Sequence, residues 1–160
     1  MSEAGNADQN PAPARAARSL LAVESGADRW LVDLADVGEV VPLPPLTPVP
    51  LARAWFAGLV NLRGTLYGVS DLAAFHGGSA TTRDDNARLL LAAPRHGQQS
   101  ALLVGRVLGL RGLDDLEALP AAGAGPAWCG DLYRDAKGVS WTRLRLPELL
   151  RDRAFLEIGV

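Results

Sequence analysis

The chain contains a single cysteine, Cys129, among its 160 residues. One cysteine cannot form an internal disulfide, so the sequence favours a reducing compartment such as the cytoplasm. The chain has only two histidines, His76 and His96, which are too few for a structural zinc site built from Cys and His ligands. Each histidine stands beside a glycine in loop-like sequence, where a solvated surface side chain is the simplest interpretation. We therefore expect no metal and no cofactor.

Long runs of one residue class are also missing. No apolar run approaches the roughly 20 residues of a membrane-spanning helix, so direct insertion into a membrane is not expected. The N-terminal residues lack the apolar core of a signal peptide. No Lys/Arg-rich run occurs and the formal net charge is −2, which argues against a nucleic-acid partner.

The sequence lacks the common catalytic and nucleotide-binding motifs. It contains no G-x-G-x-x-G, no Walker loop and no G-x-S-x-G elbow. Cys129 lies in an apolar stretch with no basic neighbour, so we expect a small buried hydrophobe rather than a nucleophile. We expect no catalytic residues and a protein that is not an enzyme. An unrecognised site near His76 or Cys129 is the enzymatic alternative.

Short extended segments separated by Gly/Pro turns fill most of the chain. Residues 1–18 are rich in Ala, Asn and Pro, which predicts a disordered tail before a folded domain over residues 19–160. A polar stretch over residues 77–86 predicts a linker between a first half, 19–76, and a second half, 87–160. Strands are predicted at residues 30–35 (half-buried), 37–43, 58–72 (a hairpin), 87–93, 100–104, 106–111, 128–133 and 139–146. Short helical segments or turns are predicted at residues 52–56, 72–75, 113–119 and 147–153.

An internal echo supports two related halves. The run V-G-E-V-V-P-L at residues 37–43 is matched by V-G-R-V-L-G-L at residues 104–110. Each run is followed by a loop, a hairpin and a short helical segment with leucines. Many short strands without a long crossover helix indicate an all-β fold, and closed sheets would leave no exposed edges. We predict two small β-barrels packed together; a single open sandwich is the alternative.

The hairpin over residues 58–72 is the most informative stretch. Gly64 can take a positive φ, so the Arg63-Gly64 pair predicts a tight turn with a lone arginine at its tip. Gly68 and Ser70 on the following strand predict a shallow apolar depression beside that arginine. Arginine and apolar anchors dominate interface energetics, so this region is a candidate docking groove.

At these residues the chain resembles the CheW-like family, the adaptor domains of bacterial chemosensory systems. The resemblance is carried by V-G-E-V-V at 37–41, the Pro-rich loop that follows, G-L-V-N-L-R-G at 58–64 and V-S-D-L at 69–72. The second half agrees through residues 88–91, 102–107 and 141–150. One departure is Gly105, which stands where the family often has an aspartate, so a contact made by that aspartate is not expected here.

The resemblance implies a fold of two five-stranded SH3-like β-barrels with a short C-terminal helix. It implies an adaptor that couples the cytoplasmic tip of a methyl-accepting chemoreceptor to the regulatory domain of a CheA-type histidine kinase. The family's glutamate and arginine lie near its receptor-binding groove, and its motif glycines border partner contacts. The resemblance therefore implies that Glu39 and Arg63 lie close enough to pair or to share a partner. The corresponding partner-binding residues implied here are Glu39, Val41, Gly58, Asn61, Arg63 and Gly64.

These implications define the expected function. We expect a cytoplasmic, non-enzymatic scaffold recruited to membrane-associated receptor arrays. The extension F-L-E-I at residues 155–158 is similar to that of PilI-type members, which implies control of type IV pili and twitching motility. A small-barrel nucleic-acid-binding protein is the alternative from a different class, and it would need a basic, aromatic-studded face.

Overall fold

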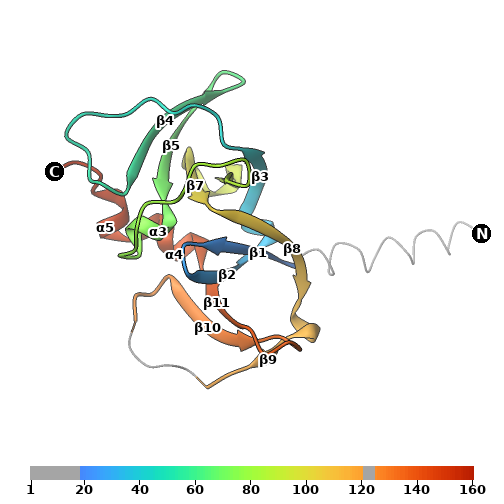
Figure 1. Cartoon of the computed structure of the whole chain (residues 1–160). Coiled ribbons are helices and arrows are strands. Elements are labelled where there is room, and N and C mark those ends of the chain that lie inside the picture. Colours follow the sequence, from blue (N-terminus) through green and yellow to red (C-terminus); the bar gives the residue numbers. More distant parts are fainter. Residues whose placement is uncertain (1–18, 121–124) are drawn as a thin grey trace, which may run out of the picture.

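The computed structural model describes residues 19–120 and 125–160, so the tail predicted over residues 1–18 lies outside the described residues. Within the described ranges, two sheets of six and five strands make up the fold (Figure 1). The strands are β1 Ser19–Ser25, β2 Asp28–Asp33, β3 Val37–Pro42, β4 Phe56–Leu62, β5 Thr65–Asp71, β6 Arg88–Ala92, β7 Ser100–Val104, β8 Arg106–Gly112, β9 Glu117–Ala118, β10 Cys129–Arg134 and β11 Ser140–Leu144. The short helices are η1 Leu34–Asp36, α3 Leu72–Phe75, η2 Pro94–His96, η3 Leu113–Asp115, α4 Leu146–Arg151 and α5 Arg153–Leu156. The all-β prediction with a short C-terminal helix is confirmed.

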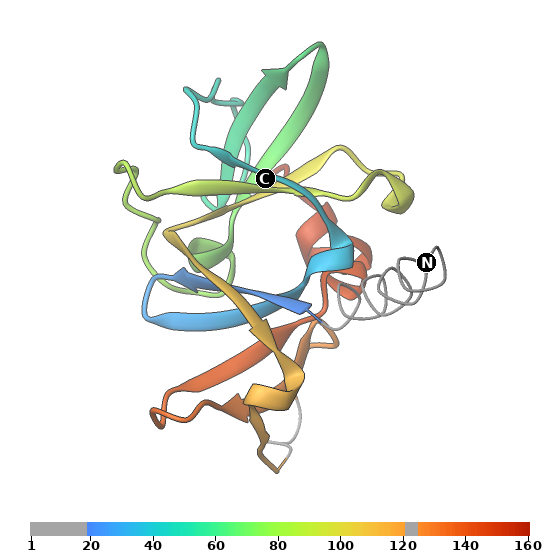
Figure 2. The ribbon, with the colours of Figure 1, turned by 90° about the vertical axis from the view of Figure 1, so that its right-hand side faces the viewer.

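Both sheets combine antiparallel pairs with one parallel pair. The six-stranded sheet has the order β8-β1-β2-β11-β10-β9, and the five-stranded sheet has the order β3-β6-β7-β5-β4. The parallel pairs are β2 with β11 and β5 with β7. The five-stranded sheet lies above the six-stranded sheet in Figures 1 and 2, and α4 lies between them.

The internal echo is present in the order of the elements, but each sheet takes strands from both sides of residues 77–86. Strands β1 and β2 pair with β8, β10 and β11, whereas β6 and β7 pair with β3, β4 and β5. The first two strands of each repeat are therefore exchanged into the sheet of the other repeat. The two sheets therefore do not correspond one to one with residues 19–76 and 87–160. Among the described residues, neither sheet closes into a ring of paired strands, and β9 gives one sheet a sixth strand.

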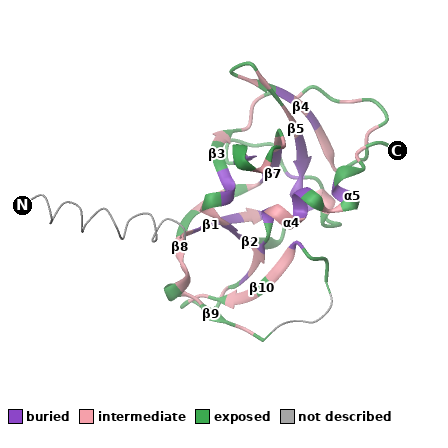
Figure 3. Cartoon of the chain, turned by 180° about the vertical axis from the view of Figure 1, so that it is seen from behind, coloured by how far each residue is buried: buried purple, intermediate pink, exposed green. Residues whose placement is uncertain are grey.

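The exchange explains the burial of β2, which the sequence predicted to be only half-buried. Trp30 and Val32 face a core cluster shared by the two sheets, whereas Leu31 packs in a separate cluster with Trp141. A strand in the middle of a sheet that is covered on both faces is apolar on both faces. Figure 3 shows the resulting buried positions along β1, β2 and β5.

The C-terminal segment packs onto the loop between β3 and β4. Helices α4 and α5 are separated at Asp152, whose side chain accepts a hydrogen bond from the Phe155 N–H at 3.1 Å. Residues 52–56, predicted as a helical turn, contain no helix: Ala52 pairs with Gly159 in an antiparallel bridge, residues 54–55 form a turn, and Phe56 begins β4. In the part of the chain that the structure describes, no helix is long and apolar enough to cross a membrane.

Candidate functional site

Glu39 and Arg63 form an ion pair where the two ends of the curled five-stranded sheet come together. Glu39 lies on β3, at one end of the strand order, and Arg63 lies at the tip of the β4–β5 hairpin, at the other end. The Arg63 Nη2 donates to the Glu39 Oε1. Both side chains remain open to solvent, with 67% of Arg63 and 42% of Glu39 exposed. The expectation that these residues pair is confirmed.

The turn that carries Arg63 is a left-handed two-residue loop. Arg63 has a φ of 50° and Gly64 a φ of 87°, the signs that a type I′ hairpin turn requires. The Asn61 Oδ1 accepts a hydrogen bond from the Gly64 N–H at 3.0 Å. Asn61 therefore closes the turn from within the hairpin, and Gly64 supplies the conformation that a residue with a Cβ resists.

Gly58 and Val41 pack against other parts of the chain and are not fully exposed. Gly58 is buried with a φ of 138°, and a Cβ built on it would lie 2.5 Å from the Thr47 carbonyl oxygen. Thr47 and Leu59 exchange two backbone hydrogen bonds of 2.8 Å, which hold the Pro-rich loop (residues 43–55) against β4. Val41 packs against the core cluster inside the five-stranded sheet. Both residues therefore support the five-stranded sheet that carries the ion pair.

The depression predicted over Gly68 and Ser70 is absent. A Cβ built on Gly68 would lie 3.3 Å from the Phe56 ring, so that ring covers the glycine, and Ser70 is buried. Two exposed apolar side chains lie close to the ion pair in the sequence: Val40, the residue after Glu39 on β3, and Leu66 on β5, three residues after Arg63. We call Glu39, Val40, Arg63 and Leu66 the hairpin patch. Its four residues are all exposed, and its two charged side chains are already paired.

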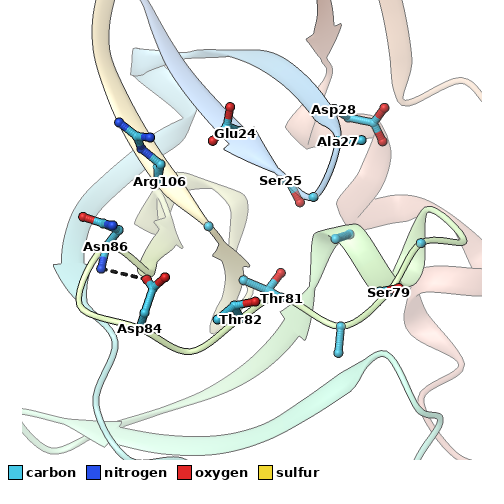
Figure 4. A pocket seen from close by; sticks show the side chains of 15 residues that line it. Glu24, Ser25, Ala27, Asp28, Ser79, Thr81, Thr82, Asp84, Asn86 and Arg106 are labelled. Carbon is cyan, nitrogen blue, oxygen red and sulfur yellow. Dashed lines mark hydrogen bonds between the residues drawn. The ribbon is translucent and has the colours of Figure 1, made fainter.

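A polar hollow of about 480 Å³ lies elsewhere, between the β1–β2 turn, the start of β8 and residues 78–86 (Figure 4). Ser25 lies at its wall, and the buried Ser25 Oγ has no hydrogen-bond partner among the described residues. Carboxylates of Glu24, Asp28 and Asp84 are spread around the hollow and do not converge on one point (Figure 4). In the described residues, no group of three or more His, Cys, Asp and Glu could hold a metal ion.

A second hollow, of about 490 Å³, contains the residues of the enzymatic alternative. His76 and Cys129 both line it, and the His76 ring packs edge-on against Trp30 with centroids 5.2 Å apart. Burial raises the pKa of the Cys129 thiol, and the nearby Asp28 carboxylate raises it further. A raised pKa keeps the thiol protonated and therefore unreactive at neutral pH. The arrangement offers no activated nucleophile.

A buried polar cluster around Asp36 was not found from the sequence. The Asp36 Oδ1 accepts from the Arg95 guanidinium and lies 3.1 Å from the His96 Nε2. His96 is therefore not the solvated surface residue that was predicted; its side chain is largely buried beside Asp36. The cluster joins the β2–β3 connection to the β6–β7 turn. No local signal marks a contact between residues 59 and 60 positions apart in the chain.

The pH dependence of stability reports on this cluster. Burial is the main cause that raises the Asp36 pKa above its ordinary 3.8; Asp33 raises it too, while Arg95 and His96 oppose the rise. The folded state then binds the proton more tightly than the unfolded chain, so the free energy of unfolding falls as pH rises from 3.8 through the raised value. The Asp36→Asn variant should lose this fall and gain stability relative to wild type across that window.

Urea unfolding at a series of pH values measures the effect. Asp114→Asn, which neutralises an exposed carboxylate in η3, controls for the loss of one negative charge. A stability difference between Asp36→Asn and wild type that stays flat, or shrinks with rising pH, would contradict the assignment.

Comparison with known proteins places this geometry in a family. The CheW-like domain family matches residues 19–154. The scaffolding protein TtCheW from Thermoanaerobacter tengcongensis has the same fold, with a TM-score of 0.71 over 88% of this chain and 97% of that chain, at 20% sequence identity. A search among curated protein sequences finds no relative of the chain. The chain belongs to the CheW-like family, and it is a non-enzymatic scaffold.

Proposed function

We propose that this chemotaxis scaffold couples the cytoplasmic tip of a methyl-accepting chemoreceptor to the regulatory domain of a CheA-type histidine kinase. Membership in the CheW-like family supports the proposal, and the hairpin patch is the observation that carries it. Arg63 is an exposed arginine held at a hairpin tip, and arginine is enriched among the residues that dominate protein interfaces. The exposed Val40 and Leu66, which are close to the pair in the sequence, add apolar area for a partner to cover. The site of action we propose is the cytoplasmic side of membrane-associated receptor arrays.

The proposed mechanism needs no bond-making chemistry. Binding receptor and kinase to one scaffold raises the effective concentration of each for the other. A scaffold whose affinity differs between two receptor states shifts the kinase equilibrium by that difference in binding free energy. The preformed ion pair of the hairpin patch limits the entropy lost on binding, since the two long side chains are already held together.

We further propose that the output is type IV pilus motility. The support is the similarity of the 155–158 extension to PilI-type members. In the fold, this extension is tied to the domain, because Phe155 is buried and the Arg53 N–H donates to the Ile158 carbonyl at 2.7 Å.

The Arg63→Ala variant tests the coupling function. We expect about tenfold weaker binding of a receptor-tip fragment, because truncating an interface arginine commonly costs 1 kcal/mol or more. The free energy of unfolding should change by about 1 kcal/mol or less, since the Glu39 ion pair is exposed. Calorimetric titration with the receptor-tip fragment, and separately with the kinase regulatory domain, measures both affinities.

Arg83→Ala is the matched control, because Arg83 is an exposed arginine outside the hairpin patch. In cells, Arg63→Ala should reduce the twitching zone and leave flagellar swimming unchanged; the reverse pattern would refute the pilus output. A folded Arg63→Ala protein that binds both partners as tightly as wild type would remove the hairpin patch from the mechanism.

A further inference from the structure

Asn61 has a different place in the hairpin from Glu39 and Arg63, which form the exposed ion pair. Its side-chain Oδ1 accepts the Gly64 N–H within the same hairpin. Asn61 stands directly before the last residue of β4, so this hydrogen bond spans the turn that displays Arg63. Within the described residues, Arg63 is one of two non-glycine residues with positive φ, the other being Leu51. A residue with a Cβ occupies that region only where its surroundings hold it there.

We propose that Asn61 is a positioning residue, which fixes the left-handed turn so that the Arg63 guanidinium reaches Glu39 and the partner meets a preformed pair. This inference rests on the proposed coupling function and deepens it. The pair joins the β4–β5 hairpin to β3, the two ends of the strand order, which the curl of the sheet brings within reach of one arginine side chain. The direction in which the turn sends the arginine therefore decides whether the pair forms.

Loss of the Asn61 side chain would leave the Gly64 N–H to water and release the turn to other conformations. A partner that binds only the conformation with the left-handed turn can then bind only a fraction of the molecules. Its apparent dissociation constant rises in inverse proportion to that fraction. For Asn61→Ala we expect receptor-tip binding to weaken about threefold to tenfold by this effect. Asn61→Asp keeps an acceptor oxygen at the same position and should bind within about twofold of wild type.

A double-mutant cycle separates positioning from direct contact. If Asn61 acts through Arg63, adding Asn61→Ala to the Arg63→Ala variant changes receptor-tip affinity no further. Thr65→Ala, which truncates a polar side chain on the opposite side of the same turn, is the matched control and should leave affinity unchanged. A partner-free readout is the NMR signal of the Arg63 Nε–H, which should move toward that of free arginine in Asn61→Ala but not in Asn61→Asp.

The outcomes distinguish this inference from the proposed function. If Arg63→Ala binds the receptor tip normally, the coupling role of the hairpin patch fails, and the NMR signal alone decides whether Asn61 positions Arg63. If Arg63→Ala weakens binding but Asn61→Ala weakens it equally in both backgrounds, Asn61 is a contact residue and the inference is overturned. Wild-type affinity and an unshifted Arg63 signal in Asn61→Ala would also overturn it.

Discussion

Replacing Phe155 by alanine should lower the free energy of unfolding by about 3–5 kcal/mol, the usual result of removing a buried phenylalanine. Phe155 is 4% exposed and stacks on Trp55 with ring centroids 5.9 Å apart and planes at 11°. Its ring also meets Phe75 edge-on at 5.3 Å. Truncation removes both contacts and leaves a cavity in the core cluster between the sheets.

The effect should extend beyond the lost ring contacts. Phe155 anchors the segment that pairs with the Pro-rich loop, where the Val160 N–H donates to the Leu51 carbonyl at 2.9 Å. Leu156→Ala is the matched control, since Leu156 is the next residue and is 52% exposed. Its truncation should change stability by about 0.5 kcal/mol or less. Urea unfolding followed by tryptophan fluorescence compares the two variants, and equal small losses would show that the C-terminal extension is not part of the core.

Local features of the fold could be predicted because they depend on neighbouring residues. The Arg63-Gly64 turn followed from the need for positive φ, and β3 through β8 followed from short apolar runs bounded by turns. The exchange of strands could not be predicted in this way. Trp30 pairs with Thr142 in a parallel register, and nothing near either residue specifies a partner so far along the chain.

The candidate site was predicted in part for the same reason. Glu39 and Arg63 could be found because the V-x-E-V and N-L-R-G runs are local motifs, and their pairing followed from the resemblance. The filling of the Gly68 depression depends on Phe56, a residue on the neighbouring strand whose ring direction no pattern gives. The Asp36 cluster depends on two turns that meet only after the sheets have packed.

Gly58 and Gly64 provide a matched pair of glycines in one hairpin. Both have positive φ, at 138° and 87°, so an L side chain at either position is strained. They differ in the space around them. A Cβ on Gly64 would meet no atom within 4 Å, whereas a Cβ on Gly58 would lie 2.5 Å from the Thr47 carbonyl oxygen. The difference between the two alanine variants therefore isolates the close approach of the Pro-rich loop.

Gly64→Ala should cost about 1 kcal/mol, the strain of a Cβ in the left-handed region. Gly58→Ala should cost about 3 kcal/mol or more, because the Thr47 carbonyl cannot retreat without breaking the two hydrogen bonds that join Thr47 to Leu59. Urea unfolding of both variants measures the difference, and amide exchange at Thr47 and Leu59 should accelerate only in Gly58→Ala. Equal losses of stability in the two variants would mean that the loop yields freely, and that the close contact at Gly58 does not hold the Pro-rich loop against β4.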